Sequence, residues 1–123
     1  MKNKILISIH PDFVDKIISG EKKYEFRTKV AKKDIDKIII YSTHPTKKII
    51  AEAKVKRIVY SNPDELWQET KDFAGINKEY FDKYFKNRSV AYAYELGDIF
   101  VYDSPKELND LGFTYAPQSF VYI

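Results

Sequence analysis

The sequence contains no cysteine. The chain therefore forms neither a disulfide nor a thiolate metal site, and because small secreted proteins often depend on disulfides, we expect a cytoplasmic protein. Histidine occurs only twice, at His10 and His44, each directly before a proline. Two histidines without a spaced carboxylate partner do not make a metal-binding pattern. The sequence also lacks a phosphate-binding loop and a dinucleotide fingerprint, so we expect no metal and no cofactor.

Long hydrophobic runs are also missing. The apolar run at residues 4–9 has only five or six residues before His10 and Pro11. It is too short for a secretion signal, and no run in the chain is long enough to span a bilayer. We therefore expect no membrane partner.

The chain has 123 residues, of which 44% are hydrophobic. That length supplies one packed core, so we expect residues 1–123 to form a single domain. The net charge of +3 is unevenly spread: residues 1–61 carry 15 Lys/Arg and 7 Asp/Glu, whereas residues 62–123 carry 6 and 11. A basic half is typical of proteins with an anionic partner such as nucleic acid. The alternative is that these lysines only keep the surface soluble, which would give the same excess of positive charge.

The periodicity of the first half predicts strands at residues 4–9, 36–42 and 49–60. Pro11 fits the first turn of a helix whose apolar face carries Phe13, Val14, Ile17 and Ile18, and Gly20 fits its C-terminal cap. Residues 21–28 alternate in a way that is typical of another strand.

The second half predicts two helices followed by strands. Asn62 and Asn77 are placed to cap helices. Residues 89–102 predict one or two strands with a bulge or turn at Gly97-Asp98. Ser104-Pro105-Lys106-Glu107 predicts a further helix that ends near Gly112, and 119–123 a final strand. The fold class is therefore α+β, with five to seven strands in a bent sheet or small barrel.

One stretch, 18–29 (ISGEKKYEFRTK), crowds seven ionisable groups into twelve residues. Glu25 and Arg27 share a strand face and are placed to form an ion pair. In a regular strand Lys22 would lie on the opposite face, so it joins them only if Gly20-Glu21-Lys22 is still a turn. The guanidinium of Arg27 offers a fork of donors, the ammonium of Lys22 a point charge and the carboxylate of Glu25 an acceptor. Together they suit a polar, planar ligand. The alternative is a surface salt bridge, which contributes under about 1 kcal/mol.

The spacing Gly20-x-Lys22-x-x-Glu25-x-Arg27 resembles the G-x-K-x-x-E-x-R motif of ASCH domains, a branch of the PUA-like superfamily. The segments SIHPDFVDKIISGEKKYEFR, IIIYSTHPTKKIIAEAKV and LGFTYAPQSFVYI resemble the opening, second and closing blocks of that family, in the same order. The resemblance covers nearly the whole chain.

The resemblance implies a PUA-like mixed β-barrel with peripheral helices and a cleft beside the motif. It implies that the cleft binds RNA or a nucleotide-like small molecule. Carried over by position, the ligand-binding residues would be Lys22, Glu25, Arg27, Tyr41, Ser42, Gln118 and Ser119. Tyr92 and Tyr94 alternate with alanines, which adds Tyr94 as a residue that could stack on a base if its strand face lines the cleft.

Two other functions stay open. A small hydrolase, either an amidohydrolase on an acylated nucleoside or a ribonuclease, would use Lys22 as general base together with Glu25. The resembling amidohydrolases have a threonine where this chain has Glu25, and Glu52 is the candidate for their distant acid. A protein-interaction module would use the acidic, aromatic residues 62–88, whose helical spacing is otherwise typical of packing. The oligomeric state is not predicted.

Overall fold

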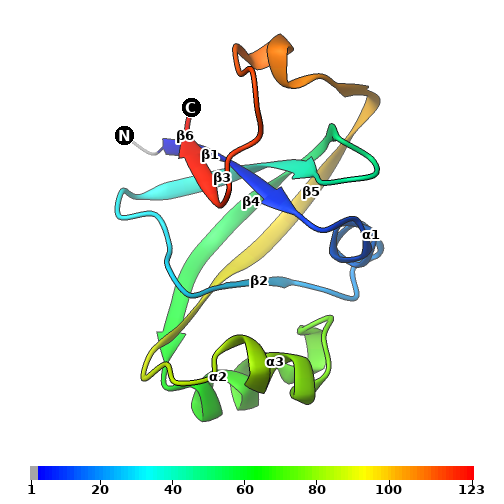
Figure 1. The fold of residues 1–123 in the computed structure, drawn as a ribbon. Helices are drawn as coiled ribbons and strands as arrows, with labels where there is room; N and C mark the ends of the chain where they lie inside the picture. The colour runs from blue at the N-terminus through cyan, green and yellow to red at the C-terminus, as the bar shows by residue number, and fades with distance from the viewer. Residues whose placement is uncertain (1–2) are drawn as a thin grey trace.

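The computed structural model describes residues 3–123, which fold into six strands and three α-helices around one curled sheet (Figure 1). This confirms the α+β class and the expected number of strands. The strands are β1 (Asn3–Ile9), β2 (Tyr24–Arg27), β3 (Ile35–Ser42), β4 (Lys48–Ser61), β5 (Ala91–Lys106) and β6 (Phe120–Tyr122). The helices are α1 (Pro11–Ser19), α2 (Pro63–Thr70) and α3 (Lys78–Tyr84), with short 3-10 helices η1 (Lys71–Phe73) and η2 (Leu108–Leu111).

The strands lie in the order β2-β5-β4-β3-β1-β6. β1 and β3 are parallel, and the other neighbours are antiparallel. The edge strands β2 and β6 do not pair with each other, so the sheet is a mixed half-barrel that stays open on one side. Among residues 3–123 no helix is both long and apolar enough to cross a membrane.

β4 and β5 form a long ribbon that runs through the whole molecule (Figure 1). Ala53 pairs with Ile99 and Val55 with Leu96, so Gly97 and Asp98 lie opposite one residue of β4. This is the bulge that the sequence predicted. The predicted helix start at Ser104-Pro105 is wrong, because β5 continues to Lys106. Only the end of the following helix, Gly112 in the left-handed conformation, agrees with the prediction.

Three apolar clusters make the core. The first lies between the sheet and α1, and the second between the sheet and the helices α2 and α3. The third lies on the face covered by η2 and the segment after it. On α1, Val14 and Ile17 are buried as predicted, whereas Ile18 is 39% exposed. These clusters fix α1 and α3 on the two sides of β2, where the motif lies.

Local signals explain where α1 ends and where α2 and α3 begin. Gly20 ends α1 with φ 89°, a conformation that glycine adopts without steric cost. Asn77 accepts a hydrogen bond from the Tyr80 amide at 2.8 Å and so begins α3, as Asn62 does for α2. The predicted caps are therefore confirmed.

Candidate functional site

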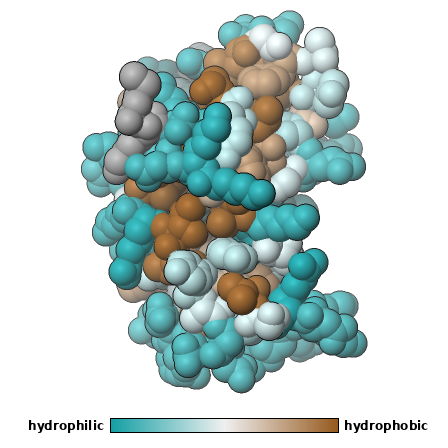
Figure 2. All heavy atoms as spheres, turned by 90° about the vertical axis from the view of Figure 1, so that its left-hand side faces the viewer, coloured by the Kyte–Doolittle hydropathy of each residue, from teal (hydrophilic) through white to brown (hydrophobic). Residues whose placement is uncertain are grey.

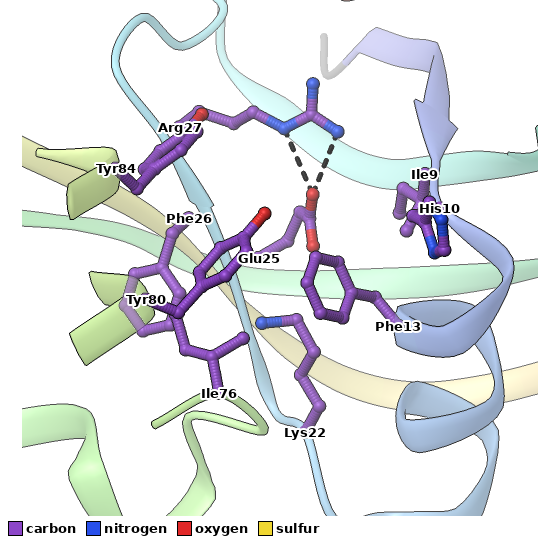
Figure 3. A pocket seen from close by; sticks show the side chains of 10 residues that line it. All are labelled: Ile9, His10, Phe13, Lys22, Glu25, Phe26, Arg27, Ile76, Tyr80 and Tyr84. Atoms are coloured by element: carbon purple, nitrogen blue, oxygen red, sulfur yellow. Dashed lines mark hydrogen bonds and ion pairs between the residues drawn. The ribbon is translucent and has the colours of Figure 1, made fainter. Parts of the chain in front are cut away.

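The chain leaves Gly20 as a turn and does not become a strand until Tyr24. The Lys22 amide donates to the Lys16 carbonyl at 3.0 Å, which closes the turn back onto α1. Because residues 21–23 are outside the strand, alternation does not apply to Lys22. Its side chain therefore lies on the same side as those of Glu25 and Arg27 (Figure 3).

These three side chains line a hollow of about 170 Å³ between α1, β2 and α3 (Figure 3). Charged groups lie on the β2 side. The aromatic and aliphatic groups come from the two helices, from the segments next to them and, in the case of Phe26, from β2. The lining residues are Ile9, His10, Phe13, Lys22, Glu25, Phe26, Arg27, Ile76, Tyr80 and Tyr84. His10, which caps the start of α1, borders the hollow.

Glu25 and Arg27 form the ion pair that their shared strand face predicts. Arg27 Nε and Nη2 both donate to Glu25 Oε2, at 3.0 and 2.8 Å. Nη2 also donates to the Ser8 carbonyl at 2.7 Å. The side chain of Arg27 is only 14% exposed and that of Glu25 only 6%, so this is not the solvated salt bridge of the alternative interpretation. Within residues 3–123, Glu25 Oε1 and Arg27 Nη1 make no hydrogen bond.

Lys22 lies at the floor of the hollow and is only 2% exposed. Its ammonium Nζ donates to the Ala74 carbonyl at 2.8 Å. It also lies 5.2 Å from the Phe13 ring centre and 4.8 Å from that of Phe26, within cation–π range. Burial lowers the pKa of Lys22 to about 8, although the Glu25 carboxylate opposes that shift. At neutral pH this amine is therefore far closer to deprotonation than an ordinary lysine.

Three consecutive carbonyls hold the motif from the side opposite β2. Those of Phe73, Ala74 and Gly75 accept from the Lys23 amide at 2.8 Å, Lys22 Nζ at 2.8 Å and Lys16 Nζ at 3.0 Å. Gly75 has φ 68°, and a Cβ there would lie 2.4 Å from Lys22 Cβ. The role of this segment could not be predicted, because backbone carbonyls carry no residue-type information.

α3 supplies an aromatic wall that the sequence assigned to packing. Phe81 and Phe85 do pack in the core, but Tyr80 and Tyr84 face the hollow and are 47% and 38% exposed. Their rings stack at 6.5 Å with an interplanar angle of 11°. Burial raises the pKa of the Tyr84 hydroxyl, so the hydroxyl stays protonated at neutral pH. The i, i+4 spacing of two tyrosines beside two buried phenylalanines was the available signal.

The other predicted site residues lie outside the hollow. Ser42 is buried and pairs with Ile9, which lines the hollow, but Ser42 itself does not. Tyr41 is buried in the third apolar cluster. Tyr94 is fully buried and its hydroxyl accepts from the Ala31 amide at 2.9 Å. The stacking role expected of Tyr94 is therefore wrong, because the ring has no surface to offer a base.

Gln118 and Ser119 lie just before β6 and are exposed. The Ser119 carbonyl accepts from the Ser8 amide at 3.1 Å, and the Ser8 carbonyl holds Arg27. These residues are thus one strand away from the guanidinium. Glu52 is held elsewhere on the sheet by Lys37 and Tyr102, each at 2.8 Å, and cannot act as a second acid in the hollow.

The hollow therefore combines one carboxylate acceptor, two cationic donors and aromatic faces in a largely desolvated space. Such a set recognises the edge of a planar ligand by hydrogen bonds and its face by stacking. Within residues 3–123 no three His, Asp or Glu side chains gather as metal ligands would.

Comparison with known proteins shows the family to which this chain belongs. The model of the ASCH domain matches residues 7–100, which include the whole motif and most of the sheet. The chain belongs to the ASCH domain family. The mixed half-barrel is accordingly the PUA-like architecture that the resemblance implied.

Several relatives are similar over most of this chain. An ASCH domain-containing ribonuclease from Zymomonas mobilis is 31% identical over 98 residues, which cover 79% of this chain and 66% of that protein. The crystal structure of ASCH from Zymomonas mobilis superposes with a TM-score of 0.89 and 29% identity, covering 98% of this chain and 87% of that chain. ATP synthase subunit alpha of Ureaplasma parvum is 25% identical over 99% of this chain but only 15% of its own length. The chain thus spans less than two thirds of these two curated relatives.

Proposed function

We propose that this protein binds single-stranded RNA and takes one base of the strand into the hollow at Lys22, Glu25 and Arg27. The observation that carries the proposal is the convergence of one free carboxylate oxygen and two cationic donors on a space walled by aromatic rings. At about 170 Å³ the hollow is smaller than the roughly 300–1,000 Å³ of most small-molecule sites. That size favours a base over a whole nucleotide.

The depth of each group suggests its role. Lys22 Nζ lies at the floor, so it meets the part of the ligand that enters furthest, and a base carbonyl oxygen fits there better than a phosphate. Arg27 is nearer the surface and keeps Nη1 for a phosphate or a base edge. Glu25 Oε1 accepts from an amino group of the base. Tyr80 and Tyr84 offer exposed ring faces for stacking.

Two further observations support an RNA ligand over other planar molecules. The half of the chain that contains the motif carries the excess of positive charge. The relatives include one named a ribonuclease and another named large ribosomal subunit protein uL22, from Ureaplasma parvum, of which the chain spans 28%.

The test is the affinity for fluorescein-labelled eight-nucleotide RNAs of mixed sequence, measured by anisotropy between about 50 and 200 mM salt. Each phosphate contact contributes a slope of about −0.7 in log K against log salt. Arg27→Ala should weaken binding at least tenfold. Arg57→Ala is the matched control, because Arg57 also pairs with a carboxylate, Glu95, but outside the hollow. Equal losses in both variants, or no binding by the wild type, would contradict the proposal.

A ribonuclease is the second candidate, and the lowered pKa of Lys22 favours it. The neutral amine would take the proton of a ribose 2′-hydroxyl, whose oxygen attacks the adjacent phosphorus. The bond from phosphorus to the 5′ oxygen then breaks, and that oxygen leaves with a proton from solvent. An amidohydrolase has less support, because Glu25 has no hydroxyl that could attack a carbonyl.

The test of this candidate is the cleavage rate of end-labelled RNA across pH. A Lys22 base predicts a rate that rises through about pH 8 and levels off above it, and that Lys22→Ala abolishes. Cleavage by Lys22→Ala at the wild-type rate would exclude Lys22 as the base and leave the binding proposal untouched.

A further inference from the structure

A second cavity, of about 710 Å³, is lined in part by the residues that directly follow β2. One wall is the segment 28–32, which follows β2, and the other consists of Tyr92, Phe120 and Tyr122 from β5 and β6. We call it the β2–β6 groove. It occupies the side on which the half-barrel is open, and it has no part in the site described above.

The residues that line the groove directly follow, in the chain, those of β2 that line the hollow. Arg27, the last residue of β2, lines the hollow, and the next residue, Thr28, lines the groove. Across the ladder Arg27 pairs with Tyr92, which also lines the groove. Neighbouring residues thus line the two spaces, and Arg27 lies between them along the chain.

Tyrosine hydroxyls fix the wall of the groove in place. The Tyr94 hydroxyl accepts from the Ala31 amide at 2.9 Å. The Tyr122 hydroxyl accepts from the Lys32 and Lys33 amides at 3.0 and 3.2 Å. A segment held by three such bonds presents its side chains in a fixed direction, which lowers the entropy lost on binding.

The chemistry of the groove suits a nucleotide. Three aromatic residues that are each half-buried supply ring surface, and the wall carries the exposed side chains of Lys29 and Lys32. Among residues 3–123, no acidic side chain lines it. Figure 2 shows apolar residues in the middle of the face on which the 28–34 segment lies in Figure 1, with hydrophilic residues around them. Aromatic faces beside cations form the usual platform for single-stranded nucleic acid.

We propose that the β2–β6 groove binds the nucleotide adjacent to the one whose base enters the hollow, with its base on the aromatic wall and its phosphate at Lys29 and Lys32. This inference rests on the proposed function and extends it, because it makes the ligand a strand of at least two nucleotides. A free nucleoside monophosphate would use the hollow alone.

The test compares two probes on the same variants: the eight-nucleotide RNA mixture and the four ribonucleoside monophosphates. Lys29→Gln with Lys32→Gln should weaken binding of the octanucleotides about tenfold and flatten the salt slope by about 1.4, while binding of the monophosphates stays unchanged. Phe120→Ala should weaken octanucleotide binding by a similar factor with the salt slope unchanged. Lys54→Gln with Lys71→Gln is the control, since both lysines are exposed and line neither space.

The outcomes separate the two proposals. If the lysine variant binds the octanucleotides more weakly but the monophosphates as well as the wild type does, the result supports the groove. Octanucleotide binding that falls with Arg27→Ala but not with either groove variant overturns the groove and leaves the hollow standing. If the wild type binds neither the octanucleotides nor the monophosphates, both proposals are overturned. The lysine variant decides the matter even if Phe120→Ala fails to fold, because both lysines are exposed.

Discussion

At the scale of single residues, burying Lys22 costs stability while the amine is charged. Its pKa is about 8 in the folded chain and 10.5 when unperturbed, a difference that corresponds to about 3 kcal/mol. The bond to the Ala74 carbonyl returns about 1 kcal/mol. We therefore expect Lys22→Met to raise the free energy of unfolding by about 2 kcal/mol at pH 7, measured by urea denaturation.

The pH dependence of that gain has a definite sign. Below pH 8 both the folded and the unfolded states carry the proton, and the folded state bears the full cost. Between about pH 8 and 10.5 the unfolded state binds more protons, so the stability of the wild type rises with pH. The advantage of Lys22→Met should shrink through this window. An advantage that is constant up to pH 10.5 would show that the amine is not desolvated. Lys54→Met, at an exposed position, is the control.

Glu25 is the carboxylate that opposes this desolvation. Because its negative charge raises the pKa of Lys22, Glu25→Gln should move that pKa below 8. The measurement is an NMR titration of the Lys22 side chain in protein labelled at lysine Cε. Glu95→Gln also removes a carboxylate from an ion pair with arginine, but not one that acts on Lys22, and should leave the titration unchanged. A Lys22 pKa that stays at 8 in Glu25→Gln would mean that the two groups are not coupled.

How much of the site could be predicted from the sequence also depends on single residues. The pairing of Glu25 with Arg27 followed from their parity, which is a local property of a strand. Lys22 could be assigned only conditionally, because its side depends on where the turn after Gly20 ends. Tyr94 was assigned wrongly: alternation gives the shared face of Tyr92 and Tyr94, but only the curl of the sheet decides that Tyr92 reaches the surface and Tyr94 does not.

At the scale of elements, the segment between η1 and α3 positions the floor of the hollow through Gly75. An alanine there must adopt φ 68°, and its Cβ would lie 2.4 Å from that of Lys22, an atom that moves only with its backbone. Left-handed strain and overpacking each cost about 1–3 kcal/mol. We expect Gly75→Ala to lower the free energy of unfolding by about 3 kcal/mol and to abolish RNA binding.

Gly112 provides the matched control for this prediction. It also has a positive φ, 85°, but no atom of the described residues lies within 4 Å of the position a Cβ would take. Gly112→Ala should therefore cost only the strain of the backbone, about 1–2 kcal/mol, and leave RNA binding intact. Equal costs in thermal or urea denaturation of the two variants would refute the proposed contact with Lys22.

The elements themselves were largely predictable, and the exception has a physical reason. Ser104-Pro105-Lys106-Glu107 has the local pattern of a helix start, yet it continues β5. β2 covers only residues 92–95 of β5, so the strand is an edge beyond that point. Proline has no amide proton to donate, but on an edge strand an outward-facing amide has no partner strand, so Pro105 is tolerated there. The 14 residues of β4 supply the pairing that extends β5, and no local pattern contains that information.

At the scale of the whole molecule, the curled sheet buries residues on both faces, and each face needs its own cover. Helices α1, α2 and α3 cover one set of clusters and position the hollow. The C-terminal 17 residues cover the other face, above Leu6, Ile39, Tyr41 and Ile49. This explains why Tyr41, predicted as a ligand contact, lies in the core. It also makes the tail a structural requirement for the site on the opposite face.

Removal of residues 107–123 tests this dependence. The cut deletes η2 and β6, and with them Leu108, Leu111, Phe113 and Val121, which pack on the third cluster. Four core side chains that are at most 6% exposed would become accessible, at about 1.5–3 kcal/mol each. That sum matches the roughly 5–15 kcal/mol by which a domain is stable. We expect the shortened chain to show no cooperative thermal transition by circular dichroism.

Leu108→Ala is the control for this truncation. It removes only part of one side chain, so it should lower the free energy of unfolding by only about 1–3 kcal/mol and keep the transition. A shortened chain that melts cooperatively within a few degrees of the wild type would mean that the helical side of the sheet folds without cover on its other face.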